Sequence, residues 1–181
     1  VLTAWCGFES SQWGGEMSIA FSEASGARIE AARQAGDANA ARQADLSIWG
    51  VYLQARAQRN TALASYVEQR FTDHFGVAYR AWLAQGEPKG GPFRMKEYVP
   101  PGTTEAMAAD QRAESRFADA LVFNQRGDNY TILTVLFALV LFFAAASTRL
   151  GRPRAQWIML GLAMSFLIAA TVILATFPID I

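Results

Sequence analysis

The sequence predicts an all-α integral membrane protein, in which a long-helix extracytoplasmic bundle precedes two transmembrane helices. Three observations predict this class. Residues 129–148 and 155–179 carry no charged side chain, and crossing a bilayer takes roughly 20 apolar residues. Residues 9–72 have helical composition and periodicity. No proline occurs before Pro88, so nothing in that stretch forces a helix to end.

Charge divides the chain into two regions. Residues 1–128 hold 13 Lys/Arg and 15 Asp/Glu, whereas residues 129–181 hold three Arg and one Asp. We therefore expect a polar extracytoplasmic stalk at 1–128 and a transmembrane region at 129–181. The formal net charge of +0 argues against a nucleic-acid partner held through its phosphates.

The first residues form an apolar stub, residues 1–5, without an initiator methionine. We expect this stub to be the outer end of a third membrane helix that lies upstream; a cleaved signal peptide is the alternative. The single cysteine, Cys6, has no partner for an internal disulfide and fits a small buried apolar residue.

A ladder of carboxylates follows the stub. Acidic residues recur every seven positions, which is nearly two helical turns, so they lie on one side of a helix. The ladder consists of Glu9, Glu16, Glu23, Glu30 and Asp37. Charges of one sign repel along a helix unless a partner supplies positive charge, which makes the ladder a candidate interaction face. A solvated helix face is the alternative.

Gly36-Asp37 predicts a helix stop and restart, with glycine as the C-cap and aspartate as the N-cap. Beyond it, apolar residues at three- and four-residue spacing predict a second helix with one inward stripe. The stripe consists of Leu46, Trp49, Leu53, Ala57, Asn60, Leu63, Val67 and Phe71.

Two arms of equal length, each about 54 Å at ~1.5 Å per residue, would return the chain to the membrane surface near residues 71–76. Aromatic side chains favour the headgroup level of a bilayer. Phe71, Phe75, Tyr79 and Trp82 are therefore candidate membrane-interface anchors.

Residues 86–103 are dense in glycine and proline and predict a long connecting loop. Thr103 or Thr104 then caps a last helix, which we expect to continue through Asp128 into the first span. Residues 1–128 would thus form a three-helix stalk.

The two spans, 129–148 and 155–179, are joined by a short loop at 149–154. This loop contains Arg149, Arg152 and Arg154 and no acid, which marks it as cytoplasmic. We therefore expect a bacterial inner (cytoplasmic) membrane protein with residues 1–128 in the periplasm. Tyr130 and Trp157 lie near the span ends as further interface anchors.

Motifs for catalysis, metals or nucleotides are not apparent. His74 is the single histidine, and no Glu-x-x-His motif or cysteine pair accompanies it, so a structural or interfacial role is favoured over metal ligation. The nucleophile elbow, the P-loop and the dinucleotide fingerprint are absent from the sequence. We expect no enzymatic activity, no cofactor and no metal.

Several residue groups resemble those of a family of uncharacterised bacterial inner-membrane proteins. The groups are Arg70-Phe71 with Phe75 and Trp82-Leu83; Gly91-Pro92-Phe93 with Tyr98; and Asp128-x-Tyr130 with Thr134-Val135-Leu136-Phe137-Ala138 and Leu141-Phe142-Phe143-Ala144. The resemblance implies one N-terminal span, a helical periplasmic segment and two C-terminal spans. It implies no activity and no functional residues.

These patterns favour a non-enzymatic membrane protein that forms assemblies, either with itself as a homo-oligomer or as an accessory subunit of a membrane complex. The lipid bilayer is its other expected partner. An oligomeric ion channel or transporter is one alternative, with Thr131 and Thr134, or Ser165 and Thr171, around a central axis. A membrane sensor that lacks its own output domain is another.

Overall fold

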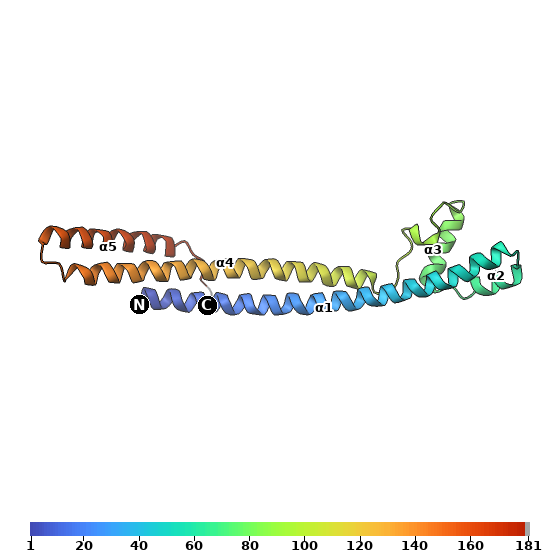
Figure 1. Ribbon diagram of the computed structural model, residues 1–181, viewed down its shortest axis with the longest axis horizontal. Helices are drawn as coiled ribbons and strands as arrows, with labels where there is room; N and C mark the ends of the chain where they lie inside the picture. Colours follow the sequence, from blue (N-terminus) through green and yellow to red (C-terminus); the bar gives the residue numbers. More distant parts are fainter. Residues whose placement is uncertain (180–181) are drawn as a thin grey trace. The chain divides into compact units, whose positions relative to one another are not determined.

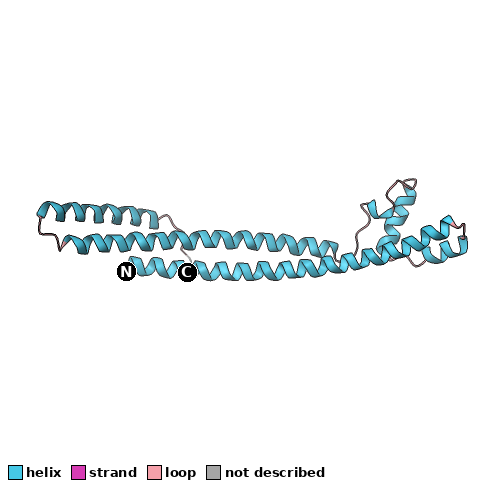
Figure 2. Cartoon of the chain, viewed as in Figure 1, coloured by secondary structure: helices cyan, strands magenta, loops and turns pink. Residues whose placement is uncertain are grey.

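The computed structural model describes residues 1–179, and every regular element in that range is a helix (Figure 1, Figure 2). The all-α class is therefore confirmed. The elements are α1 (Leu2–Ala57), α2 (Thr61–Glu68), α3 (Asp73–Ala84), the 3-10 helix η1 (Pro92–Arg94), α4 (Thr103–Ser147) and α5 (Pro153–Leu174). Residues 180–181, which end the predicted transmembrane region, lie outside the described residues.

The chain divides into two compact units. Unit 1 consists of Val1–Ala24 and Glu114–Ile181, and unit 2 consists of Ser25–Ala113. Both α1 and α4 contribute residues to each unit. The two units are described in turn, after the course of the helices themselves.

The predicted stop at Gly36-Asp37 is wrong, because α1 runs unbroken from Leu2 to Ala57. A single glycine inside a helix costs about 1 kcal/mol, and the alanine, arginine and glutamine residues around Gly36 are good helix formers. A Cβ on Gly36 would meet no atom within 4 Å, so neither a turn nor a close contact requires glycine there. One long helix therefore replaces the two equal arms expected from the sequence.

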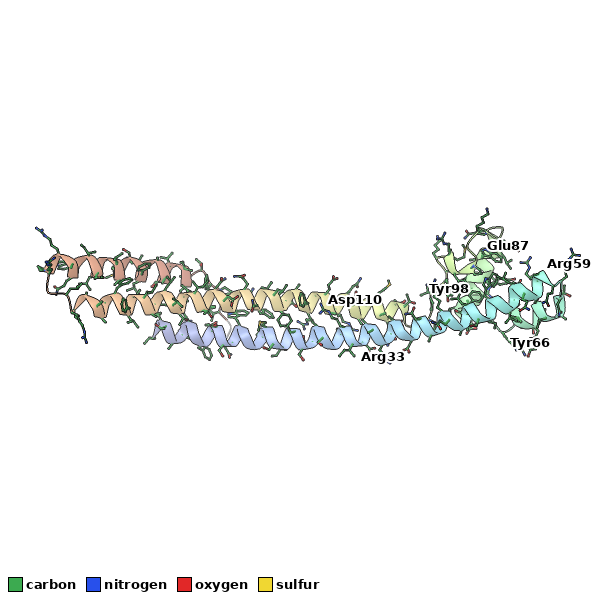
Figure 3. The ribbon with its side chains drawn as sticks, viewed as in Figure 1. Arg33, Arg59, Tyr66, Glu87, Tyr98 and Asp110 are labelled. Atoms are coloured by element: carbon green, nitrogen blue, oxygen red, sulfur yellow. The ribbon has the colours of Figure 1, made fainter. Side chains whose placement is uncertain are left out.

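The first reversal of the chain comes instead after Ala57. Arg59, labelled in Figure 3, lies in this reversal. It adopts a φ of 56°, and the backbone N–H of Asn60 donates to the carbonyl of Ala55 at 2.9 Å. A left-handed residue followed by such a bond is a common way to end an α-helix. The Asn60 side chain then accepts from the N–H of Leu63 at 3.0 Å and caps α2.

This reversal divides the predicted amphipathic stripe between two helices. Trp49 and Val67 are buried, whereas Leu46 and Leu53 are 47% and 46% exposed and Leu63 is also exposed. The regular three- and four-residue spacing continues across the turn between α1 and α2, so the spacing alone does not reveal this turn. Only part of the stripe therefore faces the core.

The last predicted helix is confirmed: α4 starts at Thr103 and continues past Asp128 to Ser147. Its first turn begins at Gly102, whose carbonyl accepts from the N–H of Ala106 at 2.8 Å. Gly102 has a φ of 88°, and a Cβ there would lie 2.5 Å from the carbonyl oxygen of Gln34 on α1. Both the backbone conformation and the close helix contact therefore require glycine.

Two helices, α4 and α5, are long and apolar enough to cross a membrane. In the most apolar 18-residue window of each, only 22% and 11% of the residues are buried, so both helices leave apolar faces uncovered within the chain. Helix α5 ends at Leu174, five residues before Ile179, where the second predicted span ends. Pro178 lacks an N–H and disfavours helix at the residue before it.

Unit 1 has a core formed by α1, α4 and α5. It is made of Cys6, Trp13, Tyr130, Leu133, Phe137 and Ala170. The Tyr130 hydroxyl donates to the carbonyl of Pro178 at 2.7 Å, which holds the segment after α5 against α4. At Gly127 the backbones of α1 and α4 approach closely, because a Cβ would lie 3.5 Å from the carbonyl oxygen of Ser10.

Candidate functional site

An aromatic cluster forms the core of unit 2. Helices α1 and α3 supply most of its rings, and those of α3 recur at three- and four-residue spacing, so they share one helix face. The buried members are Trp49, Tyr52, Val67, Phe75, Tyr79 and Trp82, with Phe71, Phe93, Met95 and Tyr98 packed against them. Trp49 lies at the centre: its ring centroid is 5.4 Å from that of Trp82 and 5.2 Å from that of Tyr52. Such ring pairs stabilise a core beyond the area that they bury.

A buried carboxylate lies at one edge of the aromatic cluster. Asp45 of α1 is 0% exposed, and its oxygens accept from Thr72 Oγ1 at 2.6 Å and from the Tyr98 hydroxyl at 2.9 Å. His74 Nε2 lies 2.6 Å from Oδ2 of the same carboxylate. We name Asp45, Thr72, His74 and Tyr98 the Asp45 node. Through these contacts the Asp45 carboxylate connects α1 with the start of α3 and with the 86–103 loop.

Two further contacts fasten the loop. The indole Nε1 of Trp82 donates to the carbonyl of Pro88 at 2.9 Å, and Arg56 Nη1 lies 3.2 Å from Glu87 Oε2. Glu87 and Tyr98 therefore fix opposite ends of this loop on unit 2 (Figure 3). The predicted connector is an ordered element with its own partners.

Two tyrosine hydroxyls of the cluster, those of Tyr79 and Tyr98, have raised pKa values. Burial raises the pKa of Tyr98, and the hydrogen bond that it donates to Asp45 raises this pKa further. Burial likewise raises the pKa of Tyr79, whose hydroxyl lies 2.5 Å from that of Tyr52. The guanidinium pKa of Arg56 is raised mainly by the charge of Glu87.

The Asp45 node can orient an imidazole, but it lacks a nucleophile to activate. Among residues 1–179, the hydroxyl recorded within bonding distance of the His74 ring is Thr72 Oγ1, 3.4 Å from Nε2, and it already donates to Asp45. A general base needs its reacting partner within about 3.2 Å or one bridging water. The described residues also contain no group of three His, Cys, Asp or Glu side chains placed to hold a metal ion.

A second buried carboxylate lies in unit 1. Glu9 of α1 is 0% exposed and lies next to the unit 1 core, within electrostatic range of Cys6 and Tyr130. The neighbouring Ser10 donates to the carbonyl of Gly127 at 3.0 Å and lies 2.9 Å from Thr131 Oγ1. The Glu9 carboxyl group therefore lies near the start of the apolar stretch 129–148, which contains no charged residue.

The five acids of the ladder meet different surroundings. Glu9 is buried, whereas Glu16 and Asp37 are exposed. Glu23 Oε2 forms an ion pair with Arg116 Nε of α4 at 2.9 Å. Glu30 is bonded by Arg33 at 2.7 Å and by Gln34 at 2.8 Å, and these bonds lower its pKa to about 2. Arginines of the chain itself therefore supply positive charge to Glu23 and Glu30.

The candidate membrane-interface anchors lie in three different environments. Phe71, Phe75, Tyr79 and Trp82 lie together in the aromatic cluster, so packing within unit 2 accounts for their positions. Tyr130 is fully buried in the unit 1 core. Trp157 is 75% exposed in the first turns of α5.

Arg149, Arg152 and Arg154 are all exposed and lie at or next to the connection between α4 and α5. The Leu150 carbonyl of this connection accepts from Gln156 Nε2 at 2.7 Å. The loop is therefore short and ordered, and its three charged groups point to solvent.

The hydroxyls of the two apolar helices bond to their own backbones. Thr134 donates to Tyr130, Ser165 to Gly161 and Thr171 to Leu167, at 2.8–3.0 Å, in each case to the carbonyl four residues earlier. Thr131 makes the same kind of bond to Gly127. These hydroxyls have backbone partners and need no aqueous pore to satisfy them.

Sequence reasoning missed the Asp45 node. The sequence analysis assigned no acidic partner to His74, because the observed partner, Asp45, is 29 positions away along the chain. Asp45 directly precedes the apolar Leu46 and has no motif around it. Tyr98 appeared only among the residues of the family resemblance.

No protein-family model matches the chain, and no curated protein and no solved structure is similar to it.

Proposed function

We propose that the chain is a non-enzymatic membrane protein that forms assemblies, with further copies of itself or as an accessory subunit of a membrane complex. The observation that carries the proposal is the pair of apolar helices, α4 and α5, whose most apolar windows stay largely uncovered within the chain. Such surfaces need lipid or other membrane helices around them.

The chain also contains an ordered helical unit, unit 2. Unit 2 has a dense aromatic core and a fastened loop, but its polar node offers no activated nucleophile. A unit whose polar side chains bond to one another fits a scaffold or docking element better than an active site.

The proposed location is the bacterial inner membrane, with residues 1–128 in the periplasm. Support comes from the three exposed arginines, Arg149, Arg152 and Arg154, at the connection between the apolar helices. Short loops rich in Lys and Arg stay on the cytoplasmic side during insertion. The suspected membership in a group of inner-membrane proteins with three spans belongs to the same proposal.

A channel or transporter receives less support. Such proteins usually place ionisable or unsatisfied polar groups along the pathway. Here Thr131, Thr134, Ser165 and Thr171 bond carbonyls of their own helix.

The test is purification of the untagged chain from its native membrane in a mild detergent, followed by mass determination of the protein component. We expect a mass above that of the single denatured chain from the same sample, from further copies or from copurifying subunits. A monodisperse monomer without a companion protein would remove the proposal.

A further inference from the structure

Helix α1 presents a second, largely apolar face that the chain leaves uncovered. Its residues recur at alternating three- and four-residue spacing and are all exposed. We name this set the α1 stripe: Trp5, Phe8, Gln12, Gly15, Ile19 and Ser22. All six lie in unit 1. The exposed fractions of Trp5, Phe8 and Ile19 are 37%, 51% and 55%. In the sequence the same spacing continues through Gly26 and Ile29.

This spacing is that of the a and d positions of a left-handed coiled coil. The face that α1 turns toward α4 is a different one, which carries Cys6, Trp13 and Ala20. A Cβ on Gly15 would meet no atom within 4 Å, so contacts inside the chain give no reason for glycine in the middle of this helix. Small residues among larger ones let another helix approach closely.

Lipid cannot cover the whole stripe. Ser10 contacts Gly127 and Thr131 at the start of the apolar stretch of α4, so Trp5 and Phe8 lie beside that stretch. Farther along α1, Glu23 pairs with Arg116. The later stripe residues, Gly15, Ile19 and Ser22, therefore lie at the level of charged α4 turns. Water surrounds the chain there, and an exposed isoleucine is unfavourable.

We propose that the α1 stripe is the contact between two copies of this chain, arranged as a parallel helix pair; the inference rests on the proposed assembly function. Two copies inserted in one membrane by the same arginine connection have the same orientation, so their α1 helices run parallel. A parallel twofold pair is also the simplest closed homo-oligomer.

The one large polar member of the stripe fits a parallel pair. Gln12 is seven residues from both Trp5 and Ile19, so these three residues occupy the same heptad position. If this is the a position, Gln12 of one copy meets Gln12 of the other in a parallel pair, and the two amides can hydrogen-bond to each other. A single polar residue at such a position fixes the register of a coiled coil at some cost in stability.

The edges of the stripe fit this arrangement. One edge carries the exposed acids Glu16 and Glu23, and the other carries the exposed Ser11 and Ser18. In a parallel pair, each edge of one helix faces the opposite edge of its partner, five positions further along. The Ser11 hydroxyl of one copy then lies opposite the Glu16 carboxylate of the other and can donate to it. An antiparallel pair would place acid opposite acid and is disfavoured.

The test compares two cysteine variants of the full chain in native membranes. Ser22→Cys places a thiol on the stripe, and Ser115→Cys places one on the exposed surface of α4 in the same unit. The native Cys6 is buried at 0% exposure and stays in both variants as a common background. Because a disulfide requires Cα atoms within about 7 Å, we expect oxidation to give at least about tenfold more disulfide-linked dimer with Ser22→Cys than with Ser115→Cys.

A further variant tests the packing of the stripe. Ile19 is 55% exposed within the chain, and Ile19→Glu would place two like charges opposite each other in a parallel pair, so we expect it to reduce the Ser22→Cys dimer to the level of the Ser115→Cys control. A dimer that survives Ile19→Glu, or equal linking of the two cysteine variants, would overturn the stripe as the contact. Linking of Ser22→Cys to a different protein would also overturn it.

These outcomes separate the inference from the proposed function. If the purified protein contains several chains but Ser22→Cys forms no disulfide-linked dimer, the proposed assembly function still holds. Only the α1 stripe is then excluded as the contact. A monomer without companion proteins, together with no linking, removes both.

Discussion

Asp45 and His74 lie 29 positions apart in the sequence, yet the carboxylate and the imidazole meet at 2.6 Å in unit 2. The carboxylate is 0% exposed and also accepts from Thr72 and Tyr98. One charge on α1 thus fixes the start of α3 and the end of the 86–103 loop.

Asp45→Ala should destabilise unit 2 strongly. The substitution removes the shared acceptor and leaves three donors without it, so we expect a loss of about 3 kcal/mol in the free energy of unfolding. Asp37→Ala removes an exposed carboxylate from the same helix and should change it by less than about 0.5 kcal/mol. Denaturant unfolding followed by tryptophan fluorescence measures both, and equal effects would argue against the Asp45 node.

Phe75→Ala tests the aromatic cluster. Phe75 is 0% exposed and contacts the rings of Phe71 and Phe93, so its truncation should cost about 3–5 kcal/mol. Val77 lies two positions along α3 and is 45% exposed, so Val77→Ala should cost far less. Near-ultraviolet circular dichroism reports the packing of the rings. An unchanged spectrum in Phe75→Ala would contradict the described core.

The raised pKa values of Tyr79 and Tyr98 predict alkaline instability of unit 2. A group whose pKa is higher in the folded state contributes stability that is present below its unfolded pKa, about 10 for tyrosine, and is lost as pH rises above that value. We expect the unfolding midpoint to fall above this pH. Absorbance titration should show Tyr98 ionising above the ordinary range of tyrosine, and Tyr98→Phe should reduce the pH dependence.

Two glycine substitutions should act in opposite directions. Gly102 has a φ of 88° and no space for a Cβ beside Gln34, so Gly102→Ala should cost about 1–3 kcal/mol. Gly36 lies in the interior of α1 in open space, so Gly36→Ala should stabilise the helix by about 0.5–1 kcal/mol. Thermal unfolding distinguishes them. A destabilising Gly36→Ala would favour the turn that the sequence alone predicted.

The proposed topology gives the last prediction. In intact cells without their outer membrane, a membrane-impermeant maleimide should label Ser115→Cys. Gly151→Cys, between the exposed Arg149 and Arg152, should react only after the membrane is opened. The reverse pattern would place the arginine connection outside the cytoplasm.

Local signals in the sequence predicted several elements well. The uncharged runs predicted both long apolar helices, and the threonines after the proline-rich loop predicted the start of α4 at Thr103. Each of these features depends on residues that are neighbours along the chain. The early end of α5 was missed, although Pro178 was visible in the sequence.

Other features could not be predicted from the sequence. Gly36 predicts a helix stop because glycine often ends helices, but α1 continues through it at a modest cost in free energy. Spacing places Glu9 on a ladder with four other acids, but spacing does not reveal that the fold buries this one. The Asp45 node required the fold itself, since its members come from three separate segments.

The fastening of the 86–103 loop has a consequence for its behaviour. Glycine and proline content would suggest a mobile stretch that a protease cuts early. Opening this loop, however, breaks the hydrogen bond from Tyr98 to the buried Asp45 carboxylate and the hydrogen bond from the Trp82 indole to the Pro88 carbonyl. Cleavage within this segment therefore has to wait for cooperative opening of unit 2, and the rate of digestion there becomes a measure of that opening.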